Sequence, residues 1–215
     1  MILTRARMER NFQASTAQIC ALGLRRAAPG ERGASINGVL FPAPDDLAAF
    51  DARENGYARV EVAREHVELL GWHVLPAAAR VFVYVPYAPA VVRRYGSDPA
   101  TGLPRCSGAA PPPGLLPSEA PGLGLVGPSV EFPILQSYVD VCVSGCLEHG
   151  EEFAREFIRT TFLWSPYWLN ERELARRPWL HQRQYVKIDA LLREEVPEYF
   201  KHRKLESEYA VYLMH

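Results

Sequence analysis

The chain of 215 residues lacks the features that would assign it at once to a membrane or nucleic-acid-binding class. It has no basic excess, because 24 Lys and Arg stand against 25 Asp and Glu, for a formal net charge of -1 at pH 7. General binding to nucleic acid or to an anionic membrane surface is therefore not expected. No apolar run approaches the roughly 20 residues that span a bilayer, and the N-terminal MILTRARMERNFQ turns polar too soon for a secretory signal. We expect a soluble, intracellular protein without a membrane span and without a nucleic-acid partner.

Cysteine is also scarce, with Cys20, Cys106, Cys142 and Cys146 the complete set. Cys142 and Cys146 are four residues apart and would share one face of a helix, and His149 follows close behind. Zinc ligands usually come as two closely spaced pairs, and no second pair follows in the sequence. We therefore expect reduced, buried helix cysteines and no metal site.

The composition that remains is that of an ordinary globular protein, with 48% hydrophobic and 23% charged residues. The length suits one domain, and we expect residues 1–215 to form it. From about 86 to 133 the chain is rich in proline and glycine, which excludes a helix interior or a central strand there. This stretch is predicted to be a long loop inside the domain.

The pattern of apolar residues predicts strands first and helices later. Strands are expected at 18–24, 35–41, 58–62 and 80–86, with a short helix within 42–55, and helices are expected from about 134, in 134–150, 151–161 and 185–196. Strands followed by helices favour an α+β fold, with a mainly antiparallel sheet or small β-barrel and a helical C-terminal part.

The short helix and the strand after it carry the most specific motif in the sequence. INGVLF and FDARENGYARVEV together resemble the gamma-glutamylcyclotransferase-like family, in which a short helix with the pattern Leu/Phe-Asp-x-x-Glu is followed by a Gly-Tyr pair and a strand. The matching residues here are Phe50, Asp51, Glu54, Gly56 and Tyr57. The resemblance continues through residues 81–86 and 132–161 and includes Trp164 and Ser165.

This resemblance implies a small β-barrel-like fold that holds one carboxylate in a cavity. It implies an internal reaction, in which the free α-amine of a gamma-glutamyl compound attacks the side-chain carbonyl and forms 5-oxoproline. No metal or organic cofactor is implied. Glu54 is then the expected catalytic residue, and Tyr57 and Gly56 the expected substrate-binding residues, with a small gamma-glutamyl compound as substrate.

The position of Glu54 suits acid–base chemistry. One carboxylate can take a proton from the attacking amine and give it to the leaving nitrogen. We expect Glu54 to line a concavity, where burial and the last helix carbonyls would disfavour its charged form. The alternative interpretation is that Glu54 is an exposed carboxylate at the end of a helix. Tyr57 would be a pocket wall or a plain strand-edge aromatic, and Asp51 is expected to cap or pair locally.

The sequence departs from the family at the Tyr-Gly-Ser loop that follows the family's first strand. Backbone N–H groups of that loop face the substrate, and losing such donors lowers the rate by about a hundredfold or more. The chain begins at MILTRARMER, about where the family has already passed this loop. A Tyr-Gly-Ser-Asp run at 95–98 lies in the Pro-rich stretch, where a type I turn is expected.

Two further hypotheses therefore stand beside a working cyclotransferase. In one, the chain keeps the fold without activity and is a structural or binding subunit of a larger assembly, with protein partners held through the Trp- and Tyr-rich region 162–180. The alternative for that region is that its aromatic residues form the domain's own core. In the other hypothesis, the fold binds a gamma-glutamyl ligand as a sensor without turnover.

Overall fold

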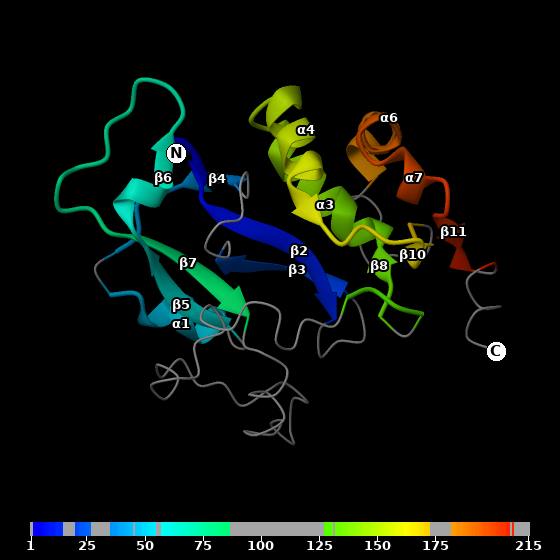
Figure 1. Ribbon diagram of the computed structural model, residues 1–215, viewed down its shortest axis with the longest axis horizontal. Helices are drawn as coiled ribbons and strands as arrows, with labels where there is room; N and C mark the ends of the chain where they lie inside the picture. The colour runs from blue at the N-terminus through cyan, green and yellow to red at the C-terminus, as the bar shows by residue number, and fades with distance from the viewer. Residues whose placement is uncertain are drawn as a thin grey trace, which may run out of the picture. The chain divides into compact units, whose positions relative to one another are not determined.

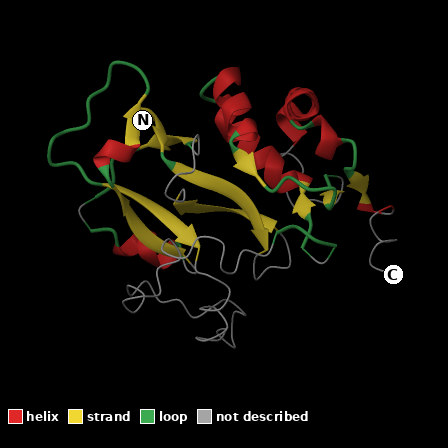
Figure 2. Ribbon diagram, viewed as in Figure 1, coloured by secondary structure: helices red, strands yellow, loops and turns green. Residues whose placement is uncertain are grey.

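The computed structural model of the chain describes residues 2–14, 20–26, 35–44, 46–54, 57–86, 127–130, 132–172, 182–206 and 208. These residues combine strands with α-helices, so the protein is α+β, as the sequence predicts (Figure 2). The predicted Pro-rich loop lies outside the described residues apart from its two ends. Within the described part of the chain, no helix combines the length and the apolar character needed to cross a membrane.

The chain forms two compact units (Figure 1). Unit 1 comprises Met1–Arg10 and Gly23–Leu125, and unit 2 comprises Asn11–Leu22 and Val126–His215. The boundary between the units falls within two strands, β2 (Met8–Ala14) and β3 (Cys20–Arg26). The 1–215 domain expected from the sequence thus contains two compact units, each with its own apolar core.

Unit 1 contains two antiparallel sheets. Its elements are β1 (Ile2–Ala6), β4 (Ile36–Leu40), α1 (Ala48–Arg53), β5 (Tyr57–Val62), the 3₁₀ turn Arg64–His66, β6 (Val67–Leu69) and β7 (Val81–Pro86). One sheet has the order β4-β1-β6, and the other pairs β5 with β7. The strands predicted at 35–41, 58–62 and 80–86 are confirmed.

The two sheets of unit 1 share one apolar core. Alternate residues of β5 face inward, so Ala58 and Val60 are buried while Arg59 and Glu61 are exposed. The core residues come from β2, β4, β5 and β7, namely Met8, Ile36, Ala58, Val60 and Val85. Helix α1 begins where the Asp46 carboxylate accepts a hydrogen bond from the backbone N–H of Ala48 at 2.9 Å.

Buried polar residues occupy the N-terminal strands of unit 1. Arg10 is 7% exposed, and its guanidinium donates to the backbone carbonyl of Asn37 at 2.5 Å and to the Asn37 side-chain oxygen at 3.3 Å. Thr4 is also buried and donates to the Gly38 carbonyl at 3.4 Å. These hydrogen bonds compensate the cost of burying polar groups.

Unit 2 places helices beside a mixed sheet. The sheet has the order β11-β10-β8-β3-β2-β9, and β3–β8, β8–β10 and β10–β11 are parallel pairs. Its other elements are β8 (Ile134–Leu135), α3 (Gln136–Leu147), α4 (Glu151–Arg159), β9 (Thr161–Phe162), β10 (Trp168–Asn170), the 3₁₀ turn Gln182–Gln184, α6 (Tyr185–Glu195), α7 (Pro197–Phe200) and β11 (Lys204–Leu205). The expected antiparallel pairing therefore describes unit 1, and the pairing in unit 2 is mixed.

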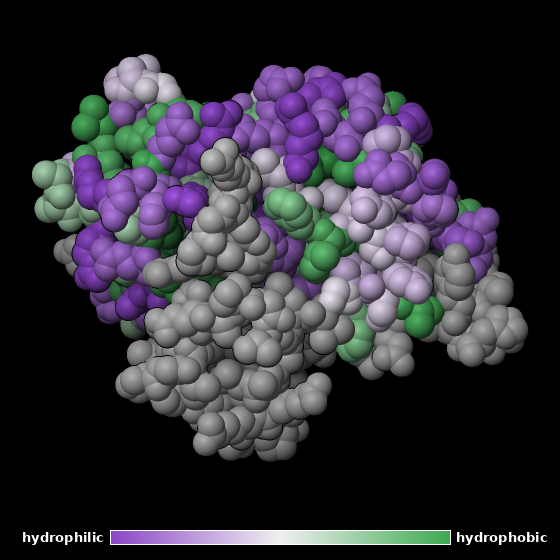
Figure 3. Space-filling view, in the orientation of Figure 1, coloured by the Kyte–Doolittle hydropathy of each residue, from purple (hydrophilic) through white to green (hydrophobic). Residues whose placement is uncertain are grey.

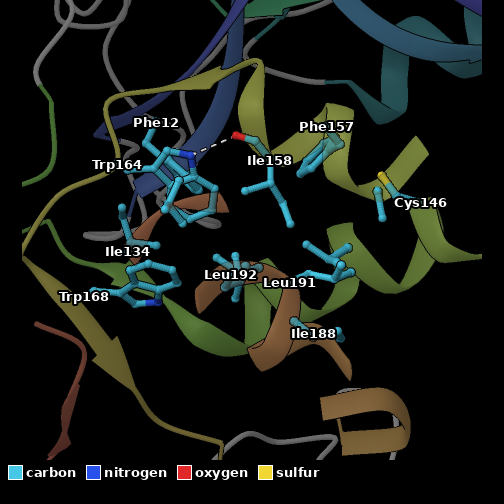
Figure 4. Packing of buried hydrophobic residues seen from close by; sticks show 14 of the residues in the cluster. Phe12, Ile134, Cys146, Phe157, Ile158, Trp164, Trp168, Ile188, Leu191 and Leu192 are labelled. Carbon is cyan, nitrogen blue, oxygen red and sulfur yellow. Dashed lines mark hydrogen bonds between the residues drawn. The ribbon is translucent and has the colours of Figure 1, made fainter. Parts of the chain in front are cut away.

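Aromatic and branched side chains fill the core of unit 2 (Figure 4). The ring of Trp164 packs edge-on against Phe12 at 4.8 Å and lies 5.0 Å from the ring of Trp168. The indole N–H of Trp164 donates to the Ile158 carbonyl at 3.2 Å, which satisfies it inside the core. Helix α3 lies against α4, α6, β8 and β10, so it is central to this unit.

Charged residues line the solvent side of α4 and of the C-terminal half of α6 (Figure 3). Arg155 of α4 pairs with Glu151 one turn earlier at 2.8 Å and with Glu195 of α6 at 2.9 Å. Arg159 adds a contact to Glu195 at 3.3 Å. These pairs tie the two helices together on the solvent side, while their apolar faces meet in the core.

Candidate functional site

The turn from α1 to β5 positions Glu54. The backbone N–H of Glu54 donates to the Phe50 carbonyl at 2.9 Å, and the Glu54 carbonyl accepts from the N–H of Tyr57 at 3.0 Å. The helix therefore ends at Glu54, and the strand starts three residues later. Gly56, which the motif makes a substrate-binding residue, lies outside the described residues.

The Glu54 side chain is half-buried, with 28% of its surface exposed. Its Oε1 atom accepts two hydrogen bonds from the neighbouring Arg53, from Nη2 at 2.9 Å and from Nε at 3.1 Å. Arg53 is itself 68% exposed, and its guanidinium lies over the Phe50 ring. The carboxylate is thus neither fully buried nor fully exposed to solvent, and its partner is an exposed arginine.

Tyr57 stands beside this carboxylate at the start of β5. Burial raises the pKa of the Tyr57 hydroxyl, and the negative charge of Glu54 raises it further. The phenol therefore stays protonated at neutral pH. It is available as a hydrogen-bond donor next to Glu54.

Asp51, one helical turn before Glu54, is paired as the sequence indicates, but its partners lie on β5 and β7. Its two oxygens accept from Nη1 of Arg59 at 2.9 and 2.8 Å, and Oδ1 also accepts from the Tyr84 hydroxyl at 2.8 Å. Arg59 and Tyr84 are register partners on β5 and β7. Burial and the Asp51 carboxylate raise the pKa of Tyr84, so this hydroxyl too is a donor.

These side chains share one face of unit 1. Asp51 and Glu54 are three residues apart on α1, which places them on the same side of the helix. Tyr57 and Arg59 are two residues apart on β5, which places them on the same side of the strand. The site therefore brings together two carboxylates, two phenols and a guanidinium held by Asp51. This set fits a polar small molecule better than an apolar one.

Arg59 and Tyr84 were not identified as site residues from the sequence. The alternation in ARVEV places Arg59 on the outward face of its strand, where an arginine is usually just solvated. Only the pairing of β5 with β7 and the position of α1 show that both residues converge on Asp51.

A second charged cluster lies in unit 2 and is fully paired. Arg172 contacts Asp140 through Nε and Nη2, both at 2.6 Å, and Asp189 through Nη2 at 2.8 Å. Arg203 donates to Asp189 and to Gln136, both at 2.8 Å, and Gln136 donates to Asp140 at 2.8 Å. Each charge is matched by an opposite one within the cluster. We therefore regard this network as structural.

The aromatic residues of 162–180 divide between core and surface. Trp164 and Trp168 are buried, so the core interpretation holds for both. Phe162, Leu163 and Tyr167 are exposed by 47%, 43% and 37%. Trp179 lies outside the described residues, as do the Tyr-Gly-Ser-Asp run at 95–98 and Cys106.

Of the two cysteines of α3, Cys146 is buried and Cys142 is half-buried. Among the described residues, no group of three or more His, Cys, Asp or Glu side chains is placed to hold a metal ion.

Cys20 is expected to be chemically inert in the folded protein. It is fully buried in unit 2 and donates to the Phe132 carbonyl at 3.1 Å, and burial raises the pKa of its thiol from 9.0 to about 12. At neutral pH this lowers its thiolate fraction about a thousandfold. Iodoacetamide labelling followed by peptide mass spectrometry should modify Cys142 well before Cys20. Equal labelling rates for the two thiols in the folded protein would contradict the burial.

Comparisons of the chain with protein-family models, with curated proteins and with solved structures find no match in any of the three.

Proposed function

We propose that the chain is a gamma-glutamylcyclotransferase-like protein that converts gamma-glutamyl amines or peptides to 5-oxoproline, with Glu54 as general acid and base. The observation that carries this proposal is the half-buried Glu54 carboxylate beside the protonated Tyr57 hydroxyl, at the turn where the sequence motif predicts both. No cofactor is needed, because the reaction only moves a proton and exchanges one C–N bond for another.

The reaction assigns a task to each side chain. The neutral α-amine of the substrate attacks the side-chain carbonyl carbon, and Glu54 takes the proton that the amine loses. The new C–N bond closes the ring, the bond to the leaving nitrogen breaks, and Glu54 returns the proton to that nitrogen. Tyr57 donates a hydrogen bond to the carbonyl oxygen as negative charge develops there.

The fold of unit 1 supports this proposal. Residues from both antiparallel sheets contribute to one apolar core. In our proposal these sheets are the barrel-like body of the family, and α1 is the short helix that carries the catalytic carboxylate. Gly56, which lies outside the described residues, is proposed as a substrate-binding residue on the motif alone.

The test is an assay on the wild-type protein. Incubation with a gamma-glutamyl alkylamide should release 5-oxoproline and the free alkylamine in equal amounts. The matched control is the same amide with its α-amine acetylated, which cannot attack and should give neither product. If gamma-glutamyl amides with a free α-amine and a range of leaving groups yield no 5-oxoproline, the proposal of a catalytic function is wrong.

A second candidate function, a binding subunit of a larger assembly, is favoured by a different observation. Phe162, Leu163 and Tyr167 expose apolar surface beside the buried Trp164 and Trp168, and Leu163 holds a backbone φ of 61° that side chains other than glycine rarely adopt. This candidate predicts that the native protein migrates with partners on size exclusion and that a Phe162→Ser change releases them. A monomeric native protein would exclude it.

A further inference from the structure

The cation best placed to recognise a substrate at this site is Arg59. Its guanidinium is fixed from two sides, by the Asp51 carboxylate at 2.8 Å and by the ring of Phe82, 5.4 Å from the ring centroid. Its side chain is nevertheless 34% exposed. Both hydrogen bonds to Asp51 come from Nη1, and a guanidinium carries five N–H donors. Arg59 therefore has donors left for a further acceptor and is held in place to use them.

Two neighbouring rows of residues, one on α1 and one on β5, connect Arg59 with Glu54. Asp51 and Glu54 follow each other along one side of α1, and Arg59 and Tyr57 occupy alternate positions along one side of β5. Asp51 contacts Arg59, and Glu54 adjoins Tyr57. The backbone positions of Tyr57 and Arg59 are thus two strand residues, roughly 7 Å, apart along β5.

We propose that Arg59 binds the α-carboxylate of the gamma-glutamyl substrate and thereby sets the specificity of the site, an inference that rests on the function proposed above. In such a substrate the α-carboxylate is attached to the carbon that also bears the attacking amine. An anchor for the carboxylate next to Glu54 therefore delivers the amine to the general base. Arginine suits this role because its planar donors match a carboxylate, and charge-assisted hydrogen bonds are the stronger ones.

Arg53 is the other cation near Glu54, and it is less suited to be the anchor. It is 68% exposed, and it contacts Glu54 itself and the Phe50 ring. An anchor that holds the general base through a hydrogen bond would compete with the proton transfer. The hydrogen bonds of Arg59 go to Asp51 and not to the proposed general base.

The experiment compares two substrates that differ only in the α-carboxylate. A gamma-glutamyl alkylamide gives 5-oxoproline, and the corresponding γ-aminobutyric alkylamide, which lacks the carboxylate, gives pyrrolidinone. The wild-type protein should prefer the first, and Arg59→Gln should lower kcat/KM for it by about 30-fold or more while changing kcat/KM for the second by less than about threefold. The loss should be mainly in KM, and Arg59→Lys should restore part of it.

The matched control is Arg80→Gln. Arg80 lies over the same Phe82 ring, at 4.9 Å, but pairs with Glu61 and is 65% exposed. The Arg80→Gln variant should keep the wild-type preference for the gamma-glutamyl alkylamide over the γ-aminobutyric alkylamide. Thermal unfolding of each variant identifies any loss of folded protein. If Arg59→Gln does not fold, kcat/KM of Arg59→Lys for the two substrates tests the anchor instead.

The outcomes separate this inference from the function it rests on. If the wild-type protein makes 5-oxoproline and Arg59→Gln keeps the wild-type preference, Arg59 is not the anchor and the cyclotransferase function stands. If the wild-type protein makes no product but binds 5-oxoproline, measured by calorimetry, more tightly than pyrrolidinone and Arg59→Gln abolishes that difference, the anchor stands and turnover is wrong. If neither turnover nor this binding difference is seen, both proposals are wrong.

Discussion

Replacing Arg172 by alanine is expected to destabilise unit 2 by about 3–5 kcal/mol, because it leaves the buried Asp140 carboxylate without its cation. The Asp140 side chain has no exposed surface, and Arg172 supplies two of its hydrogen bonds, both at 2.6 Å. Removing the guanidinium also takes two hydrogen bonds from Asp189. Urea unfolding followed by tryptophan fluorescence measures the effect, since Trp164 and Trp168 lie in the core of the same unit.

The control for this change is Arg159→Ala in the same unit. Arg159 is 51% exposed, its partner Glu152 is 84% exposed, and its other partner Glu195 also pairs with Arg155. The loss of Arg159 should therefore cost less than about 1 kcal/mol. Equal costs for Arg159→Ala and Arg172→Ala would show that the buried network contributes no more than a surface pair.

The same network gives a pH dependence with a definite sign. Burial acts to raise the pKa of Asp189, but hydrogen bonds from Arg203 and Arg172 outweigh it and hold that pKa below its usual value. A lowered pKa in the folded state contributes stability above the unfolded value of about 4, and that contribution is lost as pH falls through the folded value. The difference in stability between the wild-type protein and Arg172→Ala should therefore narrow below about pH 4.

The sequence predicted those strands whose buried positions are apolar. In β5, valine and alanine alternate with charged residues, so both the strand and its inward face follow from the pattern. The N-terminal strands β1 and β2 were not predicted, because Thr4, Arg10 and Asn11 are buried among their residues. Arg10 is buried and donates a hydrogen bond to Asn37 on a distant strand. From the sequence alone, such a polar residue is expected to be exposed to solvent.

The short strands of unit 2 were missed for a different reason. β8 and β9 each have two residues, too few for any periodicity to appear. The buried ionic network was missed as well, because Gln136 and Arg203 are 67 residues apart and meet only through the fold. The three helices with clear apolar spacing were predicted, since their pattern extends over several turns.

The candidate site was predicted in part. A motif could indicate Glu54 and Tyr57, because they lie close together in sequence and the turn that joins them is local. It could not indicate the partners of Asp51, because Tyr84 is 33 residues away and reaches Asp51 only through the register of β5 with β7. Local sequence therefore indicated Glu54, the proposed general base, whereas the role of Arg59 as the partner of Asp51 required the structure.

Replacing Glu54 by glutamine is expected to lower kcat for 5-oxoproline formation by about 10²–10⁴-fold. Glutamine keeps the size of the side chain but can neither accept the proton of the amine nor return it to the leaving nitrogen. The fold should survive, because the contacts that close the α1–β5 turn are made by the backbone of Glu54. KM should change little if the substrate is held mainly by groups other than Glu54.

The matched control is Glu61→Gln, which removes a carboxylate from the same side of β5. Glu61 is 47% exposed and pairs with Arg80, so the change should leave kcat within about twofold of the wild-type value. Glu54→Asp tests position as well as charge, because the carboxylate is retained but withdrawn by one methylene, and an intermediate rate is expected. Initial rates of 5-oxoproline release at saturating substrate give all three values. A Glu54→Gln protein with the wild-type rate would mean that another group carries the proton, whereas an equal loss in Glu61→Gln would point to a general effect of charge on this face. Only a loss confined to position 54 identifies the half-buried carboxylate as the proton carrier.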